Sequence, residues 1–396
     1  MLIRFNRILW LQPCAESGPY DPSVKGLRML GATVMPINYR EKVLELGIGG
    51  ARKALLKIID DFTPDLILAS FFSDTYELSP EFLREVSAKA PLVINAGDDE
   101  VYGTWQTIYF AQSADAVMTS DFGGRFMYEQ LSIPTIYFRA PILDFLESLP
   151  SAERVIDVSF VGDCNKVDRS SYIEYLRENG IKVVTYGNGS ENGFVSRMGF
   201  LEIICKSKIS LNFSGRSVLS EILNREPWRV YFKHLSTRAY EAARVKTFCL
   251  SEYCLGLDEM LTIGREVDVF HSKEELLEKV NYYLEHDTER EKMASNAFDK
   301  VNRDFYGLEH LSRSYNLLHD RLQSSKGLGK KRPLFRSYDF NASEVKGNFF
   351  IFIKLLMTGK LFLAIQTIPY FFKFNLSSLV GIWKGGYELA ARVLCR

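Results

Sequence analysis

The first part of the chain alternates short apolar runs with longer stretches in which apolar residues recur at helical spacing. The apolar runs are continuous rather than alternating, which is typical of parallel strands covered by helices on both faces. Residues 49–61 and 80–88 carry the helical pattern between them. The runs predict six strands: Ile8–Gln12, Thr33–Ile37, Asp65–Ala69, Leu92–Ala96, Ala116–Thr119 and Thr135–Phe138. We therefore expect a doubly wound α/β domain over residues 1–150.

The same pattern restarts after a break at residues 149–151. It predicts strands at Asp157–Val161, Lys182–Tyr186, Ile209–Phe213, Thr247–Leu250 and Asp268–Phe270, and helices at Ser170–Asn179, Thr237–Arg244, Lys273–Glu285 and Thr288–Phe305. Ser272, followed three residues later by Glu275, is a capping-box signature for the third of these helices. The sequence thus predicts a second Rossmann-like domain over residues 151–325, facing the first across a cleft. A single large sheet is the alternative.

The end of the chain differs in composition from the rest. Residues 330–396 hold 11 Lys+Arg and 3 Asp+Glu, a charge of +8, which leaves −8 (38 against 46) for residues 1–329. The longest uncharged run of this tail, Leu361–Phe372, has 12 residues, whereas about 20 are needed to cross a bilayer. Lysines that interrupt aromatic stretches are typical of a segment lying in a membrane interface.

We therefore expect residues 326–396 to form a linker and a basic, aromatic helical tail, with residues 348–396 touching a membrane surface. The alternative is that these helices pack on the other domains or on a partner chain. The chain as a whole is neutral, with 49 basic and 49 acidic residues, and gives no electrostatic argument for nucleic acid. The six cysteines form no C-x-x-C pair, and the N-terminus has no secretory pattern. These features favour a cytoplasmic protein, with the tail on the inner face of the membrane.

Two turns of the second domain have residues suited to a phosphate ligand. Gly162 allows a tight turn after the first strand, and Arg169 lies at the start of the next helix, where free N–H groups favour an anion. Gly187 and Gly189 follow the second strand and let the backbone approach a ligand closely. Neither a G-x-G-x-x-G fingerprint nor a P-loop is present. A purely structural turn explains each segment as well.

A third segment combines acid and base in the predicted helix 237–244. Glu241 is a carboxylate that can accept both hydroxyls of a ribose, and Arg238 or Lys233 can bind a diphosphate. The alternative is a surface ion pair between Arg238 and Glu241 without a function.

Taken together, these segments resemble the C-terminal domain of the CgeB-like (spore maturation protein-like) glycosyltransferases, relatives of the group 1 nucleotide-sugar transferases. The matching pieces are VSFVGD with Arg169, KVVTYGNGS, SKISLNFSGRS, TRAYEAARVKTFCLSEYCLGLDEML and the stretch from REVDVF to AFDKV. VINAGDDEVY is more loosely similar to the first domain of that family. The resemblance covers about residues 1–325. It implies the two-Rossmann GT-B architecture and metal-independent transfer of a sugar from a nucleotide-diphosphate donor, without a cofactor.

The resemblance also implies roles for single residues. Glu241 matches the second carboxylate of the family's E-x7-E signature, which binds the ribose, while Lys233 stands where the first glutamate contacts the sugar. Arg238 matches the basic residue before the aromatic–glutamate pair and is expected to act in catalysis. The donor-binding set expected from the resemblance and from the three segments is Glu241, Arg216, Gly162, Arg169, Gly187, Gly189, Lys233 and Ser251.

An inverting transferase needs a general base near the acceptor, which would come from the first domain. All five histidines lie beyond residue 230, so the base must be a carboxylate. Asp98 and Asp99, after the fourth strand, are the candidates, with a helix cap as the alternative. The missing histidine favours a retaining reaction. Ser17 and Gly18, in the loop after the first strand, are expected on the acceptor side.

The sequence therefore favours a glycosyltransferase whose acceptor is a glycan or glycolipid. Two other classes remain open at this point: a nucleotide-sugar epimerase on the same fold, and a non-catalytic binding or assembly protein that has kept the fold.

Overall fold

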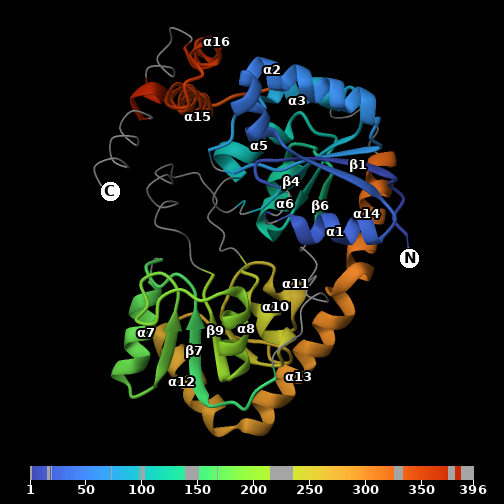
Figure 1. Cartoon of the computed structure of the whole chain (residues 1–396). Helices are drawn as coiled ribbons and strands as arrows, with labels where there is room; N and C mark the ends of the chain where they lie inside the picture. Colours follow the sequence, from blue (N-terminus) through green and yellow to red (C-terminus); the bar gives the residue numbers. More distant parts are fainter. Residues whose placement is uncertain are drawn as a thin grey trace. The chain divides into compact units, whose positions relative to one another are not determined.

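A computed structural model describes residues 2–15, 18, 20–72, 74–97, 99, 103–138, 151–166, 168–214, 235–324, 333–372 and 380–384. These residues form two compact units, each with its own parallel sheet (Figure 1). The first unit comprises residues 1–120, 124–138 and 311–396, and the second comprises residues 121–123 and 139–310.

The sheet of the first unit has six parallel strands in the order β2-β1-β3-β4-β5-β6. Their bounds are β1 Arg7–Gln12, β2 Thr33–Asn38, β3 Leu66–Ala69, β4 Leu92–Ala96, β5 Ala116–Thr119 and β6 Thr135–Tyr137. Each matches a predicted strand to within one residue at either end. Sequence pattern locates these strands well because both faces of the sheet are buried, so most of each strand is a continuous apolar run.

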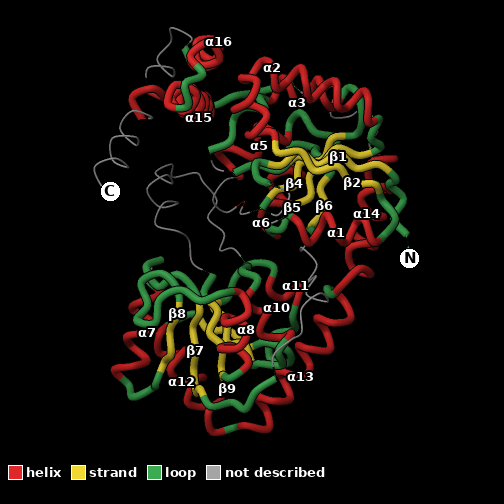
Figure 2. The backbone as a smooth tube through the Cα atoms, viewed as in Figure 1, coloured by secondary structure: helices red, strands yellow, loops and turns green. Residues whose placement is uncertain are grey.

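Helices cover both faces of this sheet, with α2 and α3 on one side and α1 on the other (Figure 2). The helices are α1 Asp21–Met29, α2 Tyr39–Phe62, α3 Pro80–Ser87, η1 Gly103–Thr107, α5 Ile108–Ala111 and α6 Phe122–Gln130. The helix predicted at residues 49–61 is the second part of α2, which begins at the Asn38 cap and changes direction at Gly47 (φ 70°, ψ 169°). Gly47 separates the two parts because this backbone conformation interrupts the helix.

The second unit has a five-stranded parallel sheet in the order β11-β10-β9-β7-β8. The strands are β7 Ile156–Val161, β8 Val183–Tyr186, β9 Ser207–Asn212, β10 Phe248–Glu252 and β11 Asp268–Phe270. Two apolar clusters lie on its two faces, one containing α8 and α10 and the other α7 and α12. The fold class predicted from the sequence, two Rossmann-like domains of the GT-B kind, is confirmed, and the alternative of one large sheet is wrong. The cleft expected between the domains stays a prediction.

The helices of the second unit and the segments after it are α7 Arg169–Glu178, α8 Arg197–Cys205, α10 Arg238–Arg244, α11 Leu257–Met260, α12 Lys273–Glu285, α13 Asp287–Asp304, α14 Gly307–Ser324, α15 Tyr338–Met357 and α16 Leu361–Phe371. Helix α12 has the predicted bounds. Its Ser272 hydroxyl accepts a hydrogen bond from the Glu275 backbone N–H at 3.1 Å. The Glu275 carboxylate bonds the His271 N–H rather than that of Ser272, so the capping box is shifted by one residue.

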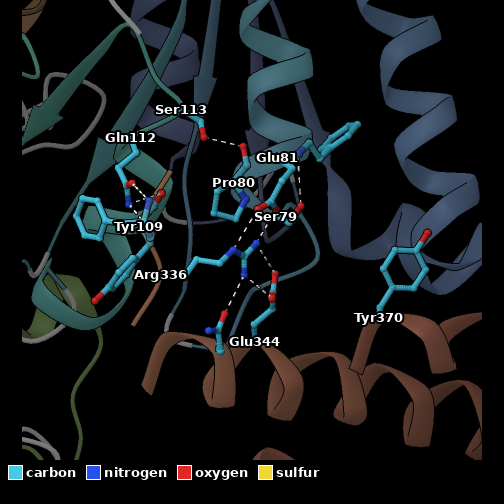
Figure 3. A network of polar contacts seen from close by, with 12 residues as sticks. Ser79, Pro80, Glu81, Tyr109, Gln112, Ser113, Arg336, Glu344 and Tyr370 are labelled. Atoms are coloured by element: carbon cyan, nitrogen blue, oxygen red, sulfur yellow. Dashed lines mark hydrogen bonds and ion pairs between the residues drawn. The ribbon is translucent and has the colours of Figure 1, made fainter. Parts of the chain in front are cut away.

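The beginning of the tail is anchored in the first unit. Phe340, on α15, is fully buried among Tyr76, Tyr109 and Phe110. Arg336 donates to carboxylates of Glu81 on α3 and Glu344 on α15, as Figure 3 shows. Helix α15 therefore packs on the first unit. This is the alternative to membrane contact that the sequence left open for the tail. Among the helices of the described residues, none combines the length and apolarity needed to span a bilayer.

Candidate functional site

The second unit contains a pocket of about 480 Å³ at the carboxyl ends of β7 and β8. It is lined by residues 161–163, 187–188, 194–197, 200, 237–238 and 241. In the sheet, β7 lies between β8, which follows it in the sequence, and β9. The chain therefore reverses its winding direction beside β7, and doubly wound sheets bind ligands at the carboxyl ends of the strands at such a point.

Two loops of this pocket fit together because glycines replace side chains between them. The Gly162 N–H donates to the Tyr186 carbonyl at 2.8 Å. Gly187 has φ 113°, and a Cβ atom there would lie 2.2 Å from the Gly162 carbonyl oxygen. Gly189 has φ 70°, and a Cβ atom there would lie 2.2 Å from the Oδ1 atom of Asn165. The main role of Gly187 and Gly189 is therefore to let the two loops approach each other closely. Gly162 and Gly187 also line the pocket.

Arg238 lies in the pocket wall with a fixed orientation. Its Nε–H donates to the Val161 carbonyl at 2.5 Å, at the end of β7. A Cβ atom on Gly162 would come within 3.1 Å of the Nη2 atom of Arg238, so the glycine leaves room for the guanidinium. Burial lowers the pKa of Arg238, and the nearby carboxylate of Glu241 opposes this shift. A partly desolvated guanidinium of this kind gains more from an anionic ligand than one in water.

Arg169 is more deeply buried, with 5% of the residue exposed. Its guanidinium donates to the carbonyls of Asp163, at 3.1 Å, and of Phe213, at 3.2 Å. Burial, and secondly the positive charge of Arg238, lower its pKa to about 10. Arg169 therefore keeps its charge at neutral pH and ties the loop after β7 to the end of β9. It is not among the residues that line the pocket.

Glu241 projects into the same pocket from α10. Its Oε1 atom lies 3.2 Å from the Nη1 atom of Arg197, on α8. The side chains are 15% exposed for Glu241 and 56% exposed for Arg197. Burial raises the pKa of Glu241, while the charges of Arg197 and Arg238 act in the opposite direction. The charge of Arg238 thus acts on Glu241, but the ion pair of Glu241 is with Arg197 rather than with the Arg238 expected from the sequence.

Several pocket residues were not anticipated from the sequence, above all Arg197 and Phe194. Arg197 begins α8, a helix absent from the predicted set, whose Ser196 cap accepts the Gly199 N–H at 3.1 Å. A serine before a helical run was the available signal. The ion pair between Arg197 and Glu241 joins residues 44 positions apart, so the local sequence pattern could not predict it. Phe194 is 82% exposed at the pocket and offers an aromatic face to a ligand.

Other predicted donor residues lie elsewhere. Ser251 is fully buried within β10, where its hydroxyl accepts from Asn212 Nδ2 at 2.9 Å and donates to the Glu252 carbonyl. The lining of the pocket does not include it. Arg216 and Lys233, as well as Asp98 and Ser17 in the first domain, lie outside the described residues.

In the first unit, Asp99 is 1% exposed. The Thr119 hydroxyl donates to its Oδ2 atom at 2.5 Å, and the Tyr128 hydroxyl donates to its Oδ1 atom at 2.6 Å. Both carboxylate oxygens are thus used within the unit, an arrangement that favours a structural role. Gly18 forms a turn in which its N–H donates to the Ala15 carbonyl at 2.9 Å.

The pocket therefore combines the carboxylates of Glu241 and Asp163, the guanidinium groups of Arg197 and Arg238, and the exposed ring of Phe194. Carboxylates accept hydrogen bonds from hydroxyls, and guanidinium groups bind phosphate oxygens. A ligand that carries both a diol and a phosphate is complementary to this set.

Solved structures with a similar fold are glycosyltransferases and related enzymes. A glycosyltransferase from Rickettsia africae superposes with a TM-score of 0.56 at 12% identity, over 82% of this chain and 100% of that one. HepE from Anabaena, in complex with UDP and glucose, gives 0.53 at 14% identity, over 81% and 100%. Sucrose-phosphate synthase from Thermosynechococcus elongatus gives 0.54 at 11% identity, over 81% and 100%. At these identities the likeness establishes the fold.

Sequence comparison adds a more local result. No curated protein matches the chain. The part of the chain that builds the pocket is nevertheless similar to a known family, since residues 145–311 match the family described as glycosyl transferase-like.

Proposed function

We propose that this protein is a glycosyltransferase that binds a nucleoside-diphosphate sugar in the pocket of its second domain and transfers the sugar to an acceptor. The observation that carries the proposal is that Glu241 and Arg238 line one pocket at the switch point of the second sheet. The family match over residues 145–311 covers this pocket. The finer relationship to the CgeB-like glycosyltransferases is part of the proposal.

In the proposed complex, the Glu241 carboxylate accepts hydrogen bonds from the two ribose hydroxyls. Arg238 and Arg197 bind the diphosphate, and the exposed ring of Phe194 stacks on the base. Uridine diphosphate is the first nucleotide to test, since HepE, which has the same fold, binds UDP. The loops that contain Gly162 and Gly187 line the same space.

The transfer breaks the bond between the anomeric carbon and the diphosphate oxygen. The oxygen of an acceptor hydroxyl forms the new bond to that carbon, while its proton passes to a base on the acceptor side. Negative charge develops on the departing diphosphate, where the Arg238 guanidinium stabilises it. Arg216 and Lys233 are proposed to add charge there, and the reaction is proposed as retaining and metal-independent.

The acceptor is proposed to be a glycan or a glycolipid, with the loops after β1 and β4 on its side. Asp98 is the remaining candidate for a base, because the carboxylate of Asp99 is already bonded to Thr119 and Tyr128. Ser17 and Gly18 are proposed to contact the acceptor.

Calorimetric titration of the full chain with UDP and other nucleoside diphosphates tests the donor site. We expect micromolar binding of at least one nucleotide and a loss of about tenfold or more in affinity in Glu241→Ala and in Arg238→Gln. Glu278→Ala, an exposed acid on α12, is the matched control and should bind as the wild type does. Equal binding by all variants, or none by the wild type, would contradict the proposal.

Nucleotide release then separates the reaction classes. A transferase releases the nucleoside diphosphate from the sugar nucleotide faster when acceptor extracts are added. An epimerase converts the sugar without acceptor-dependent release, and a binding protein does neither.

A further inference from the structure

The tail helix α16 has its large apolar residues on the outside. Its buried positions are Ala364, Thr367 and Phe371, two of which are small. Leu361, Phe362, Ile365 and Ile368 are 60%, 71%, 53% and 37% exposed. In a helix that only covers a core, the large apolar residues would face inward. We call these four residues, with Met357 at the end of α15 (79% exposed), the outer face of the tail.

The inner side of α16 packs against other helices of the first unit. The exposed residues of the outer face are therefore not needed for the packing of this helix. Ala364 packs in a cluster with Val43 and Ile48 of α2 and Leu355 of α15. The Arg52 guanidinium lies 5.1 Å from the centre of the Tyr370 ring. In the first unit, α15 and α16 lie beside each other and next to α2 (Figure 1). Helices α15 and α16 are therefore held with the outer face of the tail turned away from the rest of the first unit.

The charged side chains that the tail itself carries along this stretch have one sign. The sequence between Glu344 and Glu388 contains five lysines and no acidic residue. Of these, Lys354 and Lys360 are exposed at the turn that joins α15 and α16. The Lys360 ammonium group bonds the Leu44 carbonyl at 2.6 Å, which holds the turn on α2.

From this arrangement we propose that the outer face docks on the surface of an anionic lipid bilayer. The apolar side chains would enter the interface while the lysines approach the headgroups, the combination found in interfacial helices. A second copy of the chain is a poorer occupant, because two such faces would bring lysines against lysines without acidic partners. The proposal concerns the first unit and does not depend on the donor pocket.

Docking of this kind would also place the enzyme of the proposed function beside lipid-linked acceptors. That consequence rests on the proposed function, whereas the docking itself does not.

Vesicle co-sedimentation of the full chain tests the proposal. The wild type should sediment with vesicles of phosphatidylcholine mixed with phosphatidylglycerol and much less with phosphatidylcholine alone. The double variant Phe362→Ser/Ile365→Ser should lose about tenfold in partitioning. Lys354→Gln should lose about fivefold on the anionic vesicles. The matched control is Met29→Ser/Leu317→Ser, at two apolar positions of the same unit that are each 56% exposed. It should partition as the wild type does.

Absence of wild-type binding, or equal loss in both double variants, would overturn the proposal. Sedimentation velocity without lipid provides a further test. A dimer that the Phe362→Ser/Ile365→Ser variant dissociates would identify a second copy as the occupant and would also overturn it. UDP titration of the same variants separates this outcome from that of the proposed function, since vesicle binding without UDP binding would refute only the latter.

Discussion

The guanidinium of Arg197 and the carboxylate of Glu241 form an ion pair within the pocket of the second domain, with 3.2 Å between Nη1 and Oε1. The acid is mostly buried, whereas the base is mostly exposed. Arg197 therefore opposes the rise that burial causes in the pKa of Glu241. A ligand that forms hydrogen bonds with Glu241 must either share this carboxylate with Arg197 or displace the Arg197 guanidinium. The pair links α8 to α10, and with it the two halves of the proposed nucleotide site.

Replacing Arg197 should change the pH dependence of nucleotide binding. Burial raises the pKa of Glu241, and Arg197 partly offsets the rise. Arg197→Gln removes that offset, so the pKa should rise further and the carboxylate should be lost at a higher pH. Titrations with UDP between pH 5 and pH 8 should show the acid limb of binding displaced upward in the variant. An unchanged acid limb would mean that Glu241 does not contact the nucleotide.

The contact between Gly187 and Gly162 predicts a large effect of one methyl group. Gly187→Ala places a Cβ atom against a carbonyl at a φ of 113°, and should destabilise the second domain by about 3 kcal/mol. Gly193→Ala is the matched control, with φ 66° and open space, and should cost about 1 kcal/mol. Urea unfolding of both variants measures the difference. Similar losses would show that the two loops can separate at little cost.

The structural role of Asp99 predicts a loss of stability when one of its partners is changed. Tyr128→Phe removes a hydroxyl that donates to a buried carboxylate, which should cost about 2 kcal/mol. Tyr338→Phe, at a tyrosine that is 46% exposed, should stay within about 0.5 kcal/mol of the wild type. Denaturant unfolding of both variants provides the comparison. Equal stability of the two would argue against a structural network around Asp99.

Arg336 should stabilise the attachment of α15 in a pH-dependent way. Burial acts to raise the pKa of Glu81, but bonding to Arg336 outweighs it and holds that pKa below the usual 4.5. A lowered acid pKa contributes stability above the unfolded value and loses it as the pH falls through the folded value. Arg336→Gln should therefore cost about 2 kcal/mol near neutral pH and less below pH 4.5.

The corresponding measurement is the unfolding free energy of wild type and Arg336→Gln from pH 3.5 to 7. Arg303→Gln, which removes an arginine that is 65% exposed, should stay within about 0.5 kcal/mol of the wild type throughout. A difference between wild type and Arg336→Gln that grows toward low pH would contradict the assignment.

A structural feature can be predicted from the sequence when the residues that determine it lie close together along the chain. The strands at Leu92–Ala96, Ala116–Thr119 and Asp268–Phe270 were predicted with their observed bounds, because burial on both faces makes most of each strand a continuous apolar run. Helix α8 was missed, since its nine residues are largely apolar and lack a clear polar face. Of the residues expected to bind the donor, Glu241, Arg238, Gly162 and Gly187 line the candidate pocket, while Ser251 lies inside the sheet.

The sequence by itself determined the succession of the strands, and hence the two Rossmann-like sheets, because the burial of each strand is visible as an apolar run in its own residues. Only the tertiary structure decided that Arg197 bonds Glu241, that Gly187 meets Gly162, and that α16 turns its large apolar residues outward. These relationships join residues from separate loops and helices. Their distances are set by strand register and helix packing, which no local stretch of sequence contains.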